Sequence, residues 1–105
     1  INKTAYICSP YRANNTGQFN KQLDYTKEIS RNAVMQSYDV IVPHLYFPRF
    51  LDDDIAAERE IGMNSALNLI LICNVLIVGT KYGISGGMET EITFAKANGI
   101  RIVEV

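Results

Sequence analysis

The stretch VLIVGTKYGISGGMETEITFAKANGIRIVEV, residues 75–105, decides the fold. It begins with the short apolar run 75–78, which predicts a strand, and continues through a glycine-rich turn into helical spacing over residues 88–98. Gly99 is a favourable residue for ending that helix, and residues 100–105 form a second apolar run. We therefore expect two parallel strands joined by a right-handed helical crossover.

The same alternation extends toward the N-terminus. Residues 3–9 (KTAYICS) and 39–43 (DVIVP) are short apolar runs that predict two more strands, the second of them ended by Pro43. Apolar side chains at helical spacing predict helices over residues 20–38 and 56–72. Strands that alternate with helices in this way predict an α/β domain of three layers, built around a four-stranded parallel sheet.

The composition limits the classes of function. The chain has 105 residues, of which 48% are hydrophobic, so we expect a single domain over residues 1–105 with a substantial core. A net charge of −1 argues against binding to a nucleic acid polymer, because such proteins carry a basic excess. No apolar run is long enough to span a membrane, so no membrane partner is expected.

The two cysteines, Cys8 and Cys73, lie in or beside apolar runs, and their spacing matches no zinc or redox motif. We expect reduced core thiols in a cytoplasmic protein, with a disulfide between them as the alternative. The only histidine, His44, has no Cys or His neighbour that would complete a metal site. No metal and no organic cofactor are expected.

The segment SGGMETE, residues 85–91, carries the strongest functional signal. Glycines let a backbone approach a ligand closely, and the free N–H groups of a helix start attract anions. In the helix that follows, Glu91 is placed to attack an anomeric carbon and form a covalent glycosyl ester. The alternative is that Glu89 and Glu91 stabilise the helix dipole and that the glycines form a turn.

Two further loops follow predicted strands, at the sheet edge where such folds bind ligands. After the first strand, Arg12 offers forked donors to a phosphate and Ser9 adds a hydroxyl; a solvated Arg and a turn Ser are the alternative. Residues 43–50 (PHLYFPRF) place His44 among aromatic side chains that can stack a base; a hydrophobic plug or subunit contact is the alternative. One of Asp52, Asp53 and Asp54 is expected to cap the next helix.

These residues together resemble the nucleoside 2-deoxyribosyltransferase superfamily, which includes the deoxynucleoside 5′-monophosphate N-glycosidases. The resemblance covers nearly the whole chain. It begins with AYIC at residues 5–8 and Arg12, and it ends with the S-x-G-x-x-x-E motif of residues 85–91, followed by Ala95 and Gly99. The resemblance implies a flavodoxin-like (Rossmann-like) fold with strand order 2-1-3-4, and a homo-oligomer.

The resemblance also implies roles for individual residues. Glu91 matches the catalytic nucleophile, Tyr6 a tyrosine beside the sugar, and Arg12 an arginine beside the phosphate. Ser85 matches a ligand-contacting position, at which Ser is typical of the monophosphate-acting branch and Asp of the transferases. The residues expected to bind substrate are Ser9, Arg12, His44, Ser85, Gly86 and Gly87.

The chain also departs from the family pattern. The family has an acidic residue on the helix before the third strand, where we find only Asn64 and Asn68, and Asn74 replaces an Asp just before that strand. The chain ends at its fourth strand, without the fifth strand of the transferases. A missing acid removes the expected proton donor to the departing base.

The prediction is an enzyme that cleaves or transfers at the N-glycosidic bond of a (deoxy)nucleoside or its 5′-monophosphate. Glu91 attacks C1′, and Tyr6 orients Glu91 or the sugar. The first alternative is a non-catalytic module of the same fold that binds a nucleotide or nucleotide-sugar. The second is a structural or oligomerising domain in which Arg12 and Glu91 pair with each other.

Overall fold

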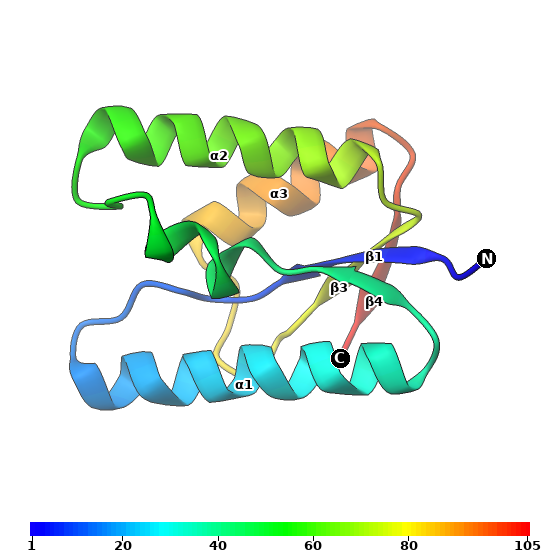
Figure 1. The fold of residues 1–105 in the computed structure, drawn as a ribbon, viewed down its shortest axis with the longest axis horizontal. Helices are drawn as coiled ribbons and strands as arrows, with labels where there is room; N and C mark the ends of the chain where they lie inside the picture. The colour runs from blue at the N-terminus through cyan, green and yellow to red at the C-terminus, as the bar shows by residue number, and fades with distance from the viewer.

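A computed structural model describes residues 1–105 as a parallel sheet between two layers of helices (Figure 1). The strands are β1 (Thr4–Cys8), β2 (Asp39–Ile41), β3 (Val75–Val78) and β4 (Arg101–Glu104), in the spatial order β2-β1-β3-β4. Helix α1 (Thr16–Met35) covers one face, and α2 (Ala56–Leu71) and α3 (Gly86–Ala97) cover the other. The predicted fold class and strand order are confirmed.

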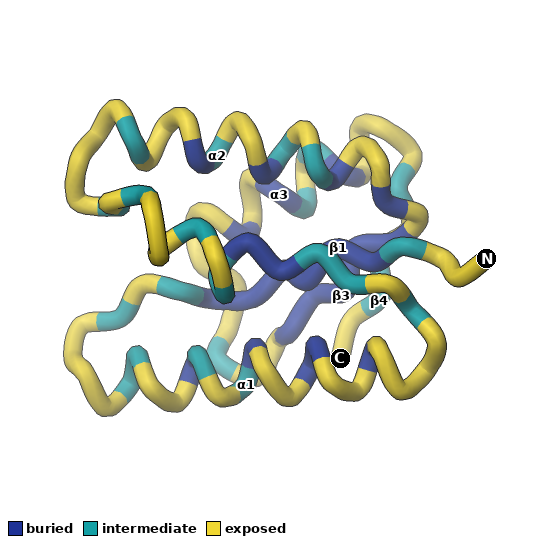
Figure 2. The backbone as a smooth tube through the Cα atoms, viewed as in Figure 1, coloured by how far each residue is buried: buried dark blue, intermediate teal, exposed yellow.

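The two central strands are buried on both faces, as their unbroken apolar sequences predict (Figure 2). Their side chains alternate between two cores, because successive residues of a strand point to opposite faces. Tyr6 and Leu76 belong to the core beneath α2 and α3, and Ile7 and Ile77 belong to the core against α1. The cavity described below begins at Tyr6.

Helix α1 begins and ends earlier than the expected residues 20–38. The Asn15 side chain accepts a hydrogen bond from the backbone N of Gln18 at 2.8 Å, so the helix starts at Thr16. At the other end Ser37 takes a left-handed φ of 69°, which stops the helix after Met35.

The predicted aspartate cap of α2 is wrong. The residue before α2 is Ile55, whose apolar side chain has no atom that can accept a capping hydrogen bond, and the three preceding aspartates make other contacts. Asp52 accepts from the backbone N of Asp54 at 3.0 Å, and Asp53 accepts from Arg12. The segment between β2 and α2, expected as a loop, contains the 3₁₀ turns Pro43–Leu45 and Phe47–Arg49.

Helix α3 begins at Gly86, two residues before its expected start at residue 88. Ser85 is the N-cap, and its hydroxyl accepts a hydrogen bond from the backbone N of Met88 at 3.3 Å. Gly86 and Gly87 are therefore the first two residues of the helix rather than part of the turn before it. This places both glycines at the helix start, where backbone N–H groups have no intrahelical acceptor.

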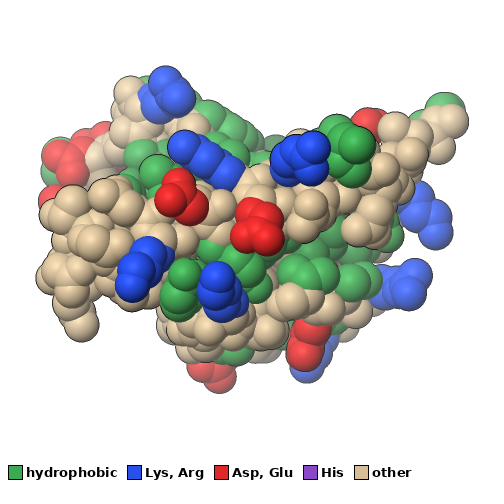
Figure 3. All heavy atoms as spheres, turned by 90° about the horizontal axis from the view of Figure 1, so that it is seen from below, with side chains coloured by type: hydrophobic (Ala, Val, Ile, Leu, Met, Phe, Trp, Pro, Cys, Tyr) green, Lys and Arg blue, Asp and Glu red, His purple; other side chains and the backbone are tan.

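The exposed face of α1 mixes both signs of charge, as Figure 3 shows from below. Its exposed charged side chains are Lys21, Asp24, Lys27, Glu28 and Arg31. A face that alternates in sign in this way does not present the continuous basic stripe that a phosphate backbone requires. No helix combines the length and the apolar character needed to cross a membrane.

Candidate active site

A cavity of about 480 Å³ opens at the carboxyl ends of the strands. Its walls come from the end of β1, the 3₁₀ turns after β2, the inner face of α2 and the first turns of α3. All the site residues named from the sequence line it, namely Tyr6, Ser9, Arg12, His44, Ser85, Gly86, Gly87 and Glu91. Three loops far apart in the sequence are thus joined in one cavity, while the chemical roles of these residues remain predictions.

Glu91 and Tyr6 form the buried end of the cavity. The Tyr6 hydroxyl donates a hydrogen bond to Oε2 of Glu91, across 85 positions of sequence. Tyr6 is 1% exposed and Glu91 is 4% exposed. Burial raises the pKa of Glu91 to about 6, although the Tyr6 hydroxyl and the Cys8 thiol act to lower it. A carboxylate with this pKa is ionised at neutral pH and little hydrated, which suits a nucleophile.

The neighbours of Glu91 remain protonated. Burial, followed by the negative charge of Glu91, raises the pKa of Tyr6 and of Cys8 well above their usual range. The Cys8 thiol lies 3.9 Å from the backbone oxygen of Met88. Tyr6 is therefore a permanent donor to the carboxylate, and Cys8 is not a nucleophile at neutral pH.

The start of α3 presents free backbone donors to the cavity. The first hydrogen bond of the helix runs from the backbone N of Glu89 to the backbone oxygen of Ser85 at 2.9 Å. The amides of Gly86 and Gly87 come before it in the chain and therefore have no acceptor within the helix. A Cβ added at Gly86 would meet no atom within 4 Å, and one at Gly87 would meet only Cε of Met63, at 3.8 Å. The glycines are thus not needed for packing, and their effect is to leave the amides uncovered toward an anion.

A buried polar network holds the loop after β1. The hydroxyls of Ser9 and Thr26 are 2.6 Å apart, and Ser9 is fully buried. The Gln22 amide donates to the backbone oxygens of Arg12 at 2.9 Å and of Tyr11 at 3.3 Å. The Ser9 hydroxyl, which we expected to contact a ligand, is therefore already bonded within the fold. The network fixes the loop from which Arg12 projects.

His44 connects the β2 segment to this loop. Its Nε2 lies 2.9 Å from the backbone oxygen of Ser9, and its ring stacks on Tyr11 with centroids 5.1 Å apart. Burial lowers the pKa of His44, so the ring is neutral at pH 7 and donates from Nε2 to the carbonyl. No three His, Cys, Asp or Glu side chains are grouped so as to hold a metal ion.

Arg12 is paired, but not with Glu91. Its Nε lies 2.5 Å from Oδ2 of Asp53, its Nη2 donates to the Asp53 backbone oxygen at 2.8 Å, and Asp54 lies 3.6 Å away. The predicted alternative of an Arg12–Glu91 pair is therefore wrong, because Glu91 is bonded to Tyr6. An anionic ligand that binds Arg12 must exchange with Asp53, in a pair that is largely open to solvent.

Helix α2 and the loop before it contribute further residues to the cavity, which the sequence did not predict. Asp53, Glu58 and Arg59 also line the cavity, together with the apolar side chains Phe47, Leu51 and Met63. Asn64 and Asn68, which we considered as substitutes for an acid, are exposed and outside it. The carboxylate that α2 does place in the cavity is Glu58. The sequence did contain a signal for Glu58. It precedes Gly62 by four residues and Ala66 by eight, which places all three on the same face of a helix.

Comparisons with known proteins agree with this fold. The model of a protein family described as a domain of unknown function (DUF7768) matches residues 3–105. No curated protein matches the sequence. A solved structure of 2-deoxyribosyltransferase from the psychrotolerant bacterium Bacillus psychrosaccharolyticus is similar, with a TM-score of 0.75 over 96% of this chain and 70% of that chain. The two sequences are 14% identical, so the similarity establishes the shared fold alone.

Proposed function

We propose that this chain, which belongs to the DUF7768 family, cleaves or transfers at the N-glycosidic bond of a (deoxy)nucleoside or its 5′-monophosphate. One observation carries the proposal. A buried carboxylate, Glu91, has a pKa of about 6 and is held by a tyrosine hydroxyl at the closed end of a cavity. The fold shared with a 2-deoxyribosyltransferase supports the same conclusion.

The reaction proceeds in two steps at C1′ of the sugar. An oxygen of the Glu91 carboxylate bonds to C1′ while the C1′–N bond breaks, and the base leaves with the bonding electron pair and takes up a proton from water. Water or a second base then attacks C1′ and releases Glu91 as the free carboxylate. Tyr6 holds the carboxylate in position through both steps.

The phosphate of a monophosphate substrate is bound at the start of α3. The amides of Gly86 and Gly87 and the hydroxyl of Ser85 face it, and Arg12 supplies the positive charge after exchanging Asp53 for the phosphate. Ser9 contributes through its bond to Thr26, which holds the loop that carries Arg12.

The test is base release from each deoxynucleoside 5′-monophosphate, followed by chromatography with and without a free acceptor base. We expect Glu91→Gln to reduce release by at least about 10³-fold, because it removes the nucleophile. Glu89→Gln is the matched control, since Glu89 is exposed on the same helix and lies outside the cavity. Release that requires the acceptor identifies a transferase.

Two outcomes would contradict the proposal. Full activity in Glu91→Gln would exclude the nucleophile. Nucleotide binding without any release would favour the non-catalytic binding module, and a rise in melting temperature with nucleotide would detect it.

We also propose that copies of the chain self-associate through the 3₁₀ segment. Tyr46 is 37% exposed and Phe50 is 65% exposed, and both rings pack on Phe47 at the edge of the cavity. A cytoplasmic location is part of the same proposal. The free thiols of Cys8 and Cys73 are consistent with a reducing compartment.

A further inference from the structure

Three carboxylates line the cavity, and they differ in how fully they are engaged. Glu91 accepts from Tyr6, and Asp53 pairs with Arg12. Glu58 makes no ion pair; its Oε1 accepts from the backbone N of Asp52 at 3.1 Å, and its Oε2 has no partner in the protein. Glu58 is therefore held in place with one oxygen available to a ligand.

Glu58 lies at the opposite end of the cavity from Glu91. Glu58, Gly62 and Ala66 are spaced four residues apart on α2, and all three line the cavity. This spacing separates the backbones of Glu58 and Ala66 by about 12 Å along the helix. Ala66 packs in the same core cluster as Tyr6, the partner of Glu91. A base joined to a sugar at Glu91 can therefore lie along α2 toward Glu58, while the 5′-phosphate turns toward the start of α3.

The space between these ends is lined by apolar side chains. A Cβ added at Gly62 would lie 3.3 Å from Cδ1 of Leu51 and 3.8 Å from Cδ2 of Phe47, so the missing side chain lets both pack against α2. Met63 and Pro48 complete this part of the wall. An apolar slot with one carboxylate at its far end fits a flat heterocycle whose far edge donates hydrogen bonds.

We infer that Glu58 determines base specificity and selects nucleobases that carry an exocyclic amino group over those with a carbonyl at that position. The Glu58 oxygen that faces the ligand accepts a hydrogen bond from an amino group and repels a carbonyl oxygen, because two acceptor oxygens have no hydrogen between them. The neighbouring Arg59 does not reverse this preference, since its Nη1 donates to the backbone oxygen of Asp53 at 3.3 Å. The inference rests on the proposed function, which places the sugar at Glu91.

The experiment compares dAMP with dIMP and dCMP with dUMP, pairs in which a carbonyl replaces the amino group and the adjacent ring nitrogen gains a hydrogen. We expect the protein to favour the amino member of each pair by about tenfold or more, in base release and in Kd measured by calorimetry. In Glu58→Gln, the amide oxygen still accepts from Asp52 and the amide NH₂ faces the ligand. The ratio of activity with the amino member to activity with the carbonyl member should then fall to about one, or reverse in favour of the carbonyl member.

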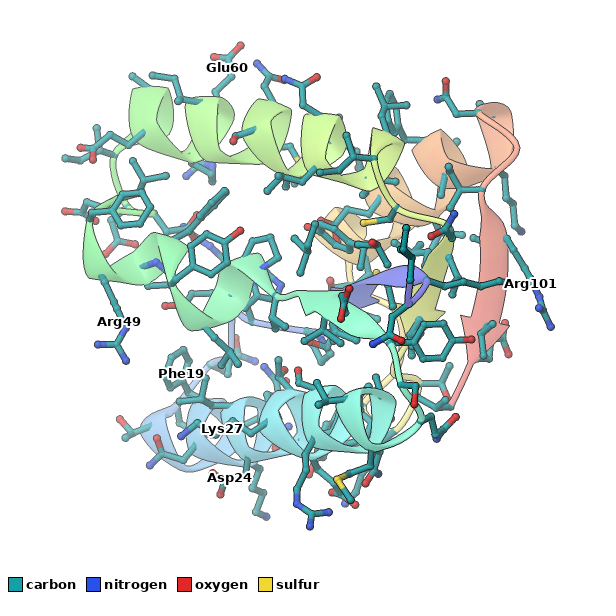
Figure 4. The ribbon with its side chains drawn as sticks, turned by 45° about the vertical axis from the view of Figure 1, so that its right-hand side comes forward. Phe19, Asp24, Lys27, Arg49, Glu60 and Arg101 are labelled. Carbon is teal, nitrogen blue, oxygen red and sulfur yellow. The ribbon has the colours of Figure 1, made fainter.

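Glu60→Gln is the matched control, because Glu60 lies on the same helix and points away from the sheet (Figure 4). It should leave both preference ratios unchanged. Equal use of both members by the unaltered protein would overturn the inference, as would an unchanged ratio in Glu58→Gln.

The binding arm is repeated in the Glu91→Gln background, where no chemistry occurs. One outcome is that the Kd values favour the amino member, that Glu58→Gln removes this preference, and that the unaltered protein releases no base. This outcome would retain the inference and contradict the glycosidase proposal. Base release without amino preference would contradict the inference alone. Absence of binding by every nucleotide would contradict both.

Discussion

At the scale of single residues, the burial that makes Glu91 suitable as a nucleophile also makes the stability of the fold depend on pH. Its pKa is raised from the ordinary 4.5 to about 6, so the folded state binds this proton more tightly than the unfolded chain does. The resulting stabilisation is complete below about pH 4.5 and is lost as the pH rises through about 6. Above that pH the protein retains a buried charge that the unfolded chain would hydrate.

This gives a prediction for Glu91→Gln, whose side chain does not titrate. Relative to the unaltered protein, its free energy of unfolding should increase by about 2 kcal/mol between pH 4 and pH 8, because the Glu91 carboxylate becomes costly over that range. Urea unfolding curves at several pH values measure the difference. Parallel profiles for Glu91→Gln and the unaltered protein would contradict the prediction.

Some site residues could be predicted from the sequence and others could not, and the difference has physical reasons. Ser85 and Glu91 stand out because they share one short segment at a helix start. The contact between Tyr6 and Glu91 was accessible only through a family resemblance, since spacing does not show which side chains meet across 85 positions. Glu58 was missed because an acid in the first turn of a helix ordinarily serves the dipole.

At the scale of elements, caps rather than apolar periodicity decided where the helices begin. Asn15 and Ser85 each extend a helix ahead of its first apolar residue, and these short polar residues are also typical of turns. The aspartates before α2 were wrongly expected to cap because nothing local reveals that Asp53 meets Arg12 on another loop. Such contacts between loops depend on the completed sheet.

The packing of α1 on β3 provides a prediction at this scale. A Cβ at Gly79 would overlap Cδ1 of Ile29 and lie 2.8 Å from Cε2 of Tyr25, so Gly79→Ala should destabilise the protein by about 1–3 kcal/mol. Gly86→Ala is the control, since open space surrounds Gly86, and it should be neutral or stabilising by up to about 1 kcal/mol. Thermal unfolding measures both, and equal effects would contradict this account of the packing.

At the scale of the whole molecule, the alternation of strands and helices in the sequence sufficed to predict the layers. It did not determine the order of the strands, because periodicity shows what is buried and not which neighbour buries it. The order β2-β1-β3-β4 came from the resemblance and is present in the structure. The cavity follows from that order, since β1 and β3 leave the sheet side by side.

Self-association is the property of the whole molecule that remains to be measured. If copies meet through the aromatic 3₁₀ segment, Phe50→Ser should lower the molar mass found by light scattering toward that of one chain, because it removes an exposed apolar contact. The melting temperature at high dilution should change little. A single-chain mass for the unaltered protein at all concentrations would contradict the prediction.

The position of β1 in the middle of the sheet has a consequence for biosynthesis. β1 is made first, yet one of its edges pairs with β3, beginning with Ala5 opposite Val75. Throughout translation of the intervening segment, that apolar strand has an open edge of the kind that recruits other chains. That edge therefore finds its partner only after residues 75–78 have been made, and until then it can pair with the edge strands of other chains.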